Sequence, residues 1–507
     1  MHPSGTTSHR LGLAFACLTV ASMAQGNSPE EPFLRQMMLR HPSIQAESLS
    51  VAGTVAMREG AASLLLPQFQ IGAKADANTD FAGTKNALGQ GTATATQLLP
   101  TGGTLSGQAL LQRSWTSVPV KTSSAWNPAI QALADTLGLA LPPSTTTTGG
   151  SSTRDTLGLE VAFMQPLLKG FGASNTTFYN VEQAQLNQKV QTQASRAQIL
   201  SLISQGRKAW WNQRAYEAIL AARSQDTSRT LRLLQATRQR RSEGSASNLD
   251  TLQAWADHLQ ARSEWLSAWT DARSGAVNLG AYLDTTEVWI GTPGDTAMLL
   301  PPSVLSSAQA SPDSLIELAQ AQAPDIAQAL ALEEKARSEE LYRSRQSLPQ
   351  LDAGVYARKG LLPEDANPSG IQFGARATFL WNIPDGVNRA TAKKAILDLR
   401  KTGIAALKAR RDLKRSLVRL TEDGRSRRQS LELALLVIQA QAARLQAAET
   451  GYRDGSASWS DLALARREWL NSLTSAWSAM ATLQAGESDL QSLTGTGPST
   501  LGWNWGN

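Results

Sequence analysis

The chain of 507 residues contains an internal duplication, and this constrains its fold more than any other feature. Leu-Pro-Gln at Pro67 recurs at Pro349, a separation of 282 residues (349 − 67). Further along, Gly-Ser-Ala-Ser at Gly244 recurs at Gly455, a separation of 211 residues (455 − 244). Two more matches fall in the same order, His41-Pro42 with Ala323-Pro324 and Glu264-Trp265-Leu266 with Glu468-Trp469-Leu470. Ordered repeats of this kind predict one structural unit built twice.

The first copy carries an insertion. The separation between the two copies falls by 71 residues (282 − 211) after the Leu-Pro-Gln landmark, so the additional chain lies between Pro67 and Gly170. Its centre, about residues 77–155, is rich in threonine, glycine and serine. We therefore divide the chain into a first repeat over 25–282, a linker over 283–312, a second repeat over 313–493 and a tail over 494–507.

Each repeat is predicted to contain three helical segments. The first segment ends at the proline of Leu-Pro-Gln, because proline stops a helix, and two longer segments follow, joined by Gly-Ser-Ala-Ser. The expected helices cover residues 32–65, 175–243 and 249–282, and then 314–348, 388–453 and 461–493. A helix of about 65 residues is about 100 Å long, which favours a coiled coil or a helical tunnel over a globular domain.

Between the first and second helices of each repeat the hydrophobic period changes to two. Phe69, Ile71, Ala73 and Ala75 alternate with polar residues, and similar runs occupy 157–163, 351–357 and 371–381. This alternation is typical of strands with one apolar and one polar face. We expect two strands in each repeat.

The N-terminus has the features of a secretory signal peptide over residues 1–24. Arg10 precedes the apolar run Leu11–Val20, and Ser22-Met23-Ala24 forms a plausible cleavage sequence. Lipidation at Cys17 is the alternative interpretation. No later stretch approaches the roughly 18 uncharged apolar residues of a transmembrane helix.

Composition argues against catalysis. With one Cys and four His in the whole chain, we predict no catalytic residues, no metal site, no cofactor and no enzyme activity. The strongest charge cluster runs from Arg389 to Arg428, with fourteen Lys or Arg and four Asp or Glu. Nucleic-acid binding is one interpretation. An apolar stripe through the same segment favours a solvated helix face or a basic tunnel lining, so we expect no nucleic-acid partner; it comprises Ile404, Leu407, Leu417 and Leu420.

Taken in order, these landmarks resemble the TolC-like outer-membrane efflux proteins. The carriers are Leu66-Pro67-Gln68, Gln165 to Gly170 and Gly244 to Asp250 in the first repeat, and Leu348-Pro349-Gln350, Trp381 to Gly386 and Tyr452 to Asp461 in the second. The resemblance implies an α+β membrane protein that assembles as a homotrimer. Each subunit would give four strands to a twelve-stranded transmembrane β-barrel and its helical hairpins to a periplasmic tunnel. Four strands cannot close a barrel alone, which agrees with an oligomer.

The resemblance also nominates functional residues at the two Gly-Ser-Ala-Ser turns. In this family the hairpin tips meet a membrane-fusion adaptor, and an aspartate lines the periplasmic entrance. The corresponding residues here are Gly244, Ser245, Ala246 and Ser247, then Gly455, Ser456, Ala457 and Ser458, with Asp461 and Asp250 at the entrance.

Simpler interpretations remain open for the same residues. Ser247 or Ser458 would serve as an ordinary N-cap, and Asp461 as a first-turn acid favoured by the helix dipole. In a ring of three, Asp461 would favour cations, and like-charge crowding would raise its pKa. The family's second aspartate is replaced by Leu464, which puts a doubled acidic ring in doubt.

The implied function is that of a passive exit duct. The protein would lie in the outer membrane, in contact with its lipid, and extend into the periplasm, where an adaptor and an inner-membrane pump of the RND or ABC type would deliver substrate. This describes a tripartite efflux or type I secretion system. The alternative is a non-conducting periplasmic coiled-coil scaffold.

Overall fold

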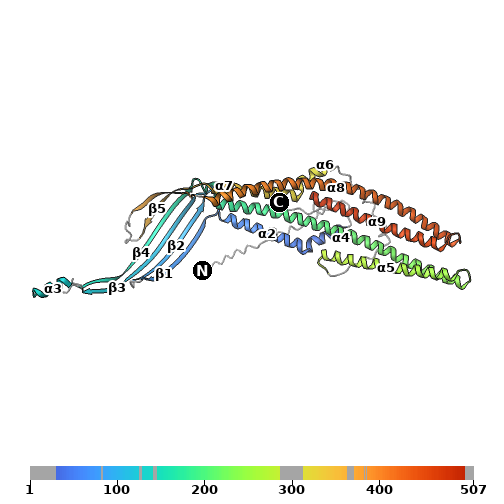
Figure 1. Cartoon of the computed structure of the whole chain (residues 1–507), viewed down its shortest axis with the longest axis horizontal. Coiled ribbons are helices and arrows are strands. Elements are labelled where there is room, and N and C mark those ends of the chain that lie inside the picture. Colours follow the sequence, from blue (N-terminus) through green and yellow to red (C-terminus); the bar gives the residue numbers. More distant parts are fainter. Residues whose placement is uncertain are drawn as a thin grey trace, which may run out of the picture.

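The computed structural model describes residues 30–80, 84–124, 128–140, 145–285, 312–361, 370–381, 383 and 385–496. The expected signal peptide with Cys17, most of the 283–312 linker and residues 497–507 of the tail lie outside this part of the chain. Figure 1 shows an elongated molecule in which a curved β-sheet occupies one end and long helices extend from it to the other.

The helices occur as two equivalent sets. The first repeat has α1 (Glu31–Arg40), α2 (Pro42–Ser63), α4 (Thr176–Ser242) and α5 (Asn248–Tyr282), and the second has α6 (Pro312–Gln322), α7 (Pro324–Gln346), α8 (Gly386–Arg453) and α9 (Trp459–Thr494). The long helices α4 and α8 have 67 and 68 residues, and their return helices α5 and α9 have 35 and 36. These matched lengths agree with the duplication.

The segment expected as one helix over 32–65 is two helices, broken at His41. Its backbone is extended (φ −64°, ψ 121°), because the ring of Pro42 disfavours a helical conformation in the residue before it. The His41 side chain then caps α2, since its Nδ1 accepts a hydrogen bond from the Ser43 amide at 3.2 Å. Ala323 and Pro324 break the corresponding segment of the second repeat in the same way.

The sheet has six strands in the described chain, not the four per subunit that we predicted for a twelve-stranded assembly. They are β1 (Gln68–Thr79), β2 (Lys85–Leu98), β3 (Thr104–Ser124), β4 (Thr145–Pro166), β5 (Gln350–Gly360) and β6 (Ile371–Leu380), antiparallel and paired in chain order. The prediction missed β2 and β3 because neither strand has a clear hydrophobic period. On β2 the apolar face has small residues such as Ala93 and Gly91, while Leu88 lies on the polar face. On β3 the adjacent Leu110 and Leu111 lie on opposite faces. A short helix, α3 (Pro128–Thr136), lies between β3 and β4.

The register divides the sheet into two faces across all six strands. One face, which we call the apolar face, carries Phe69 and Ile71 opposite Ala95 and Ala93. Its residues on the other strands include Leu105, Leu111, Leu157, Val161, Phe163, Val355, Phe373 and Phe379. The opposite, polar face carries mainly glutamine, threonine and charged residues, such as Gln70, Thr94, Gln108, Glu160, Arg358 and Gln372.

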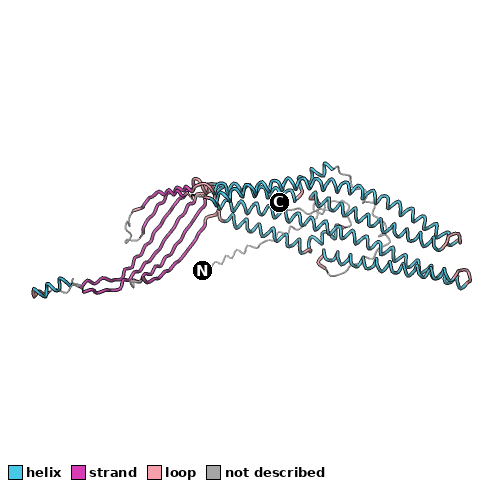
Figure 2. The backbone as a smooth tube through the Cα atoms, in the orientation of Figure 1, coloured by secondary structure: helices cyan, strands magenta, loops and turns pink. Residues whose placement is uncertain are grey.

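The helices form a layer that is four helices wide. Helix α4 packs against α2 and α7 near the sheet and against α5 and α9 farther away, while α8 packs against α7 and then α9. Figure 2 shows these helices running side by side away from the strands. A run of alanines on α5, each nearly inaccessible to solvent, allows α5 to approach α4 closely; they are Ala254, Ala261, Ala268, Ala272 and Ala276. No helix in the described part of the chain is long and apolar enough to cross a membrane.

Candidate functional sites at the helix tips and open edges

The two hairpin tips share one backbone geometry. Gly244 and Gly455 have φ values of 77° and 79°, the left-handed conformation that ends a helix and that only glycine adopts without strain. The next residue closes the turn in both cases: the Ser245 amide donates to the Arg240 carbonyl and the Ser456 amide to the Gly451 carbonyl, both at 2.8 Å. The predicted tip residues therefore occupy two equivalent reversals at the far end of the helices.

The serine that follows each turn forms a capping box with an aspartate. Ser458 Oγ accepts the Asp461 amide at 3.2 Å, and Asp461 Oδ2 accepts the Ser458 amide at 3.1 Å. Ser247 and Asp250 make the same exchange at 3.0 and 2.9 Å. This reciprocal pairing satisfies amides that the first helical turn leaves free. The capping interpretation is thus confirmed for both serines.

The capping boxes also determine the electrostatics of the two aspartates. Hydrogen bonds from the hydroxyl and amide of Ser458 lower the pKa of Asp461, and those from Ser247 lower the pKa of Asp250. The rise that we predicted for Asp461 belongs to a ring of three carboxylates, so it stays a prediction for the assembled trimer. Within one chain, Asp461 is exposed and Asp250 is half-buried, and an entrance role for the two aspartates stays a prediction.

A contact between the two tips was missed by sequence reasoning. Trp459 is buried against the first hairpin, and its Nε1 donates to Asp257 Oδ2 on α5 at 2.8 Å. Its ring meets Tyr452 edge-on at 5.5 Å, and the Arg240 guanidinium lies 5.4 Å from the centre of the Tyr452 ring. The equivalent of Trp459 in the first repeat is the exposed Asn248. Comparing the two copies at this position would have revealed the difference.

Farther from the tips, a buried ion pair joins the two hairpins. Asp226 on α4 lies 3.0 Å from the Arg466 guanidinium on α9, and both side chains are almost completely buried. Burial raises the pKa of Asp226, while the nearby Arg466 opposes that rise. Removing either partner would leave the other charge buried without compensation, which is strongly destabilising.

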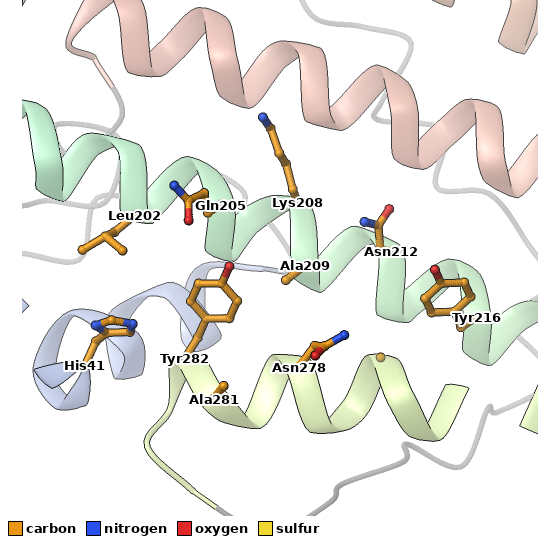
Figure 3. Close-up of a pocket in the computed structure, with 11 residues that line it drawn as sticks. His41, Leu202, Gln205, Lys208, Ala209, Asn212, Tyr216, Asn278, Ala281 and Tyr282 are labelled. Atoms are coloured by element: carbon orange, nitrogen blue, oxygen red, sulfur yellow. The ribbon is translucent and has the colours of Figure 1, made fainter. Parts of the chain in front are cut away.

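An open groove lies between α4, the end of α5 and His41. In Figure 3, Tyr282 points from α5 toward α4, and His41 lies beside it, with ring centres 5.9 Å apart. The lysine in the groove, Lys208, is already paired with Asp489 at 2.5 Å. Within the described residues no three His, Cys, Asp or Glu side chains cluster in a way that could hold a metal ion.

The long edges of the molecule are unpartnered. Within the described sheet, β1 and β6 each pair on one side only. Large apolar side chains are exposed on the two outer helices, as at Leu252 and Leu266 on α5 and at Ile404 and Leu407 on α8. Both the sheet and the helical layer thus end in surfaces suited to another chain.

No protein-family model and no curated protein matches this sequence. Solved structures do match. The outer-membrane channel OprN is 16% identical, with a TM-score of 0.64 over 92% of this chain and 90% of its own. VceC from Vibrio cholerae is 12% identical, with a TM-score of 0.60 over 92% and 95%. The open state of the MtrE channel from Neisseria gonorrhoeae is 15% identical, with a TM-score of 0.62 over 92% and 89%.

These comparisons establish the fold. The chain has the α+β architecture of these outer-membrane proteins, and the resemblance to TolC-like proteins drawn from its landmarks is confirmed at the level of the fold. The match covers almost the whole length of each neighbour, so it includes both the sheet and the helical layer. OprN and MtrE are described as channels, not as enzymes.

Proposed function

We propose that this protein is an outer-membrane exit duct that works as a homotrimer. The observation that carries the proposal is the fold: an apolar-faced sheet continues into a four-helix layer, and both have open edges. Unpaired strand edges present free backbone groups on which a strand of another chain can pair. Three copies joined edge to edge would give a closed wall whose polar face lines a passage.

The exposed apolar face supports placement of the sheet in lipid. Phe69 and Ile71 on β1 are 80% and 89% exposed, and Phe373 on β6 is 80% exposed. Contiguous apolar surface of this kind marks a site of contact with protein or membrane. A water-soluble periplasmic scaffold would leave these side chains in water, so the scaffold alternative is disfavoured.

The tips would be the periplasmic end of the duct. They lie at the end of the helices opposite to the sheet, and their small residues leave room for a partner's helices to approach. A membrane-fusion adaptor would bind at the two Gly-Ser-Ala-Ser turns, and a pump of the RND or ABC type would deliver substrate through it. In this proposal Asp461 and Asp250 border the entrance while they also cap their helices.

The decisive experiment is purification from outer membranes followed by reconstitution in planar bilayers. We expect the mass of three chains in detergent and discrete single-channel currents. A monomer found in the soluble periplasmic fraction, without conductance, would refute the duct and favour the scaffold. Co-purification of an adaptor that is lost on deletion of both Gly-Ser-Ala-Ser turns would support the tripartite assembly.

A further inference from the structure

The two halves of the sheet are not equivalent. In the second repeat, β5 pairs directly with β6, so its two strands form one hairpin. In the first repeat, the equivalent strands β1 and β4 are separated by β2 and β3, which pair with each other and with the strands on either side. The β2–β3 hairpin therefore lies within the insertion that the sequence landmarks located.

The inserted hairpin continues the pattern of the sheet. On β2, Ala93 and Gly91 lie on the apolar face, and Thr92 and Thr94 lie on the polar face. On β3, Leu105 and Leu111 extend the apolar face, while Ser106 and Gln108 extend the polar one. A hairpin that folded into the passage as a plug would need polar residues on both sides. This one has the two-faced alternation of a wall.

The turn between β2 and β3 is anchored where the sheet meets the helices. The Gly172 amide, at the start of the junction before α4, donates to the Thr101 carbonyl at 2.9 Å, and Thr101 Oγ1 lies 2.7 Å from Gln165 Oε1. Gly102 has a φ of 86°, and a Cβ there would lie only 2.4 Å from the Gly170 carbonyl oxygen. The turn thus fits closely against the β4–α4 junction.

From these observations we propose that the β2–β3 hairpin widens the outlet of the duct. The inference rests on the proposed function: if three copies close edge to edge, six strands each give a ring of eighteen instead of the twelve that the duplicated unit alone would give. At equal strand tilt the diameter grows about 1.5-fold, into the range that leaves a water-filled channel in porins. The outlet would then pass solutes too large for a twelve-stranded ring.

The size of the helical layer is consistent with the wider ring. Three layers of four helices at about 8–10 Å per helix have a circumference of roughly 96–120 Å. Strands about 4.8 Å apart and tilted by about 40° give roughly 113 Å for eighteen strands and about 75 Å for twelve. Eighteen strands would therefore continue the helical tunnel without narrowing, because the two circumferences agree.

Electron cryo-microscopy of the purified full-length assembly tests the proposal by counting strands. We expect eighteen strands around the wild-type outlet. Deleting residues 84–148 would join the far end of β1 to the far end of β4 and reproduce the two-strand plan of the second repeat. That variant should show twelve strands and should exclude, from the outer side, neutral polymers that enter the wild-type outlet.

An intrachain cross-link covers the case in which the deletion variant does not fold. Ala77 and Ala87 lie directly opposite each other on β1 and β2, and residues paired in this way lie within the span of a disulfide. The only natural cysteine is Cys17, far from these positions in the sequence. A disulfide between two introduced cysteines therefore shows that positions 77 and 87 lie opposite each other. We expect the disulfide to form in the assembled wild-type background, and a pair at Ala77 and Ser114, which the register does not oppose, to stay reduced.

The outcomes separate this inference from the proposed function. A twelve-stranded ring with β2–β3 outside the wall, or failure of the Ala77–Ala87 cross-link in the assembled protein, would overturn the wide outlet and leave the duct intact. If no ring and no conductance are found, the duct itself is refuted and the wide outlet with it.

Discussion

At the residue scale, the aspartate at each tip caps a helix at a position where we also expect it to border the entrance. Asp461 closes a capping box with Ser458, and Asp250 does the same with Ser247. The interaction holds each carboxylate against its serine. The family resemblance identified the positions, and the serine-to-aspartate spacing accounts for their geometry.

The Asp461 cap should depend on pH. Its folded-state pKa lies below the ordinary value because Ser458 donates to the carboxylate. The cap's contribution is therefore complete above the unfolded carboxyl pKa, near about pH 4, and is lost as the pH falls through the folded pKa. We expect amide protection at the start of α9, measured by hydrogen exchange, to fall below about pH 4.

The Asp461→Asn variant should lose this pH dependence, whereas Asp454→Asn at the end of α8 should retain it. Protection that stays constant down to about pH 3 in the wild-type protein would contradict the assignment, because the cap should already be weakened there.

The hydrogen bond from Trp459 to Asp257 should couple the two hairpins. Trp459→Phe removes the donor while keeping an aromatic ring, and Asp257→Asn removes the charge of the acceptor. Because Trp459 is buried, we expect a coupling energy of about 1 kcal/mol in a double-mutant cycle of denaturant unfolding.

The half-exposed Trp255 on α5 provides the control. Trp255→Phe should show no coupling with Asp257→Asn beyond error. Additive effects of Trp459→Phe and Asp257→Asn would exclude the contact.

At the scale of elements, the tips depend on glycine at one position each. A residue with a Cβ at Gly455 meets the left-handed backbone penalty of about 1–2 kcal/mol. Gly424, in the middle of α8, has open space where a Cβ would lie, with no other atom within 4 Å. Alanine stabilises a helix interior by about 0.5–1 kcal/mol relative to glycine.

Gly455→Ala should therefore lower the midpoint of denaturant unfolding, and Gly424→Ala should raise it. Equal shifts of the same sign in the two variants would show that the turn does not require the left-handed conformation.

The long helices could be predicted from sequence almost to the residue. The expected segment 175–243 is α4 at Thr176–Ser242, and 249–282 is α5 at Asn248–Tyr282. Glycine marks the turn at each tip, and Pro166 and Pro384 precede the starts of α4 and α8. The strands β2 and β3 could not be predicted, because the apolar face of β2 has alanine and glycine where large residues would mark the period, and because Leu110 and Leu111 on β3 interrupt the alternation. Contact between Trp459 and Asp257 depends on the packing of two hairpins, which local patterns do not encode.

At the scale of the whole molecule, the open edges should control assembly. Ile404 and Leu407 on α8 are 68% and 63% exposed in one chain. If α8 packs against a second copy, glutamate at both positions would place charge in an apolar contact, which is costly unless it is paired.

We expect the Ile404→Glu/Leu407→Glu variant to shift from trimer toward monomer in light scattering, while its helical content by circular dichroism stays unchanged. Gln439→Glu, at an exposed position on the same helix, is the matched control and should remain trimeric. A trimeric double variant would mean that this part of α8 faces away from the interface.

Because each chain has two similar hairpins that differ at their tips, the fold has a consequence for the number of partner molecules that a trimer binds. A trimer would present six tips at the same end, three from each repeat, in alternation. Trp459 and Asn248 occupy equivalent positions but differ in burial, so neighbouring tips are not interchangeable. Six partner molecules would then bind in two alternating classes, and a partner selective for one class would bind three to a ring.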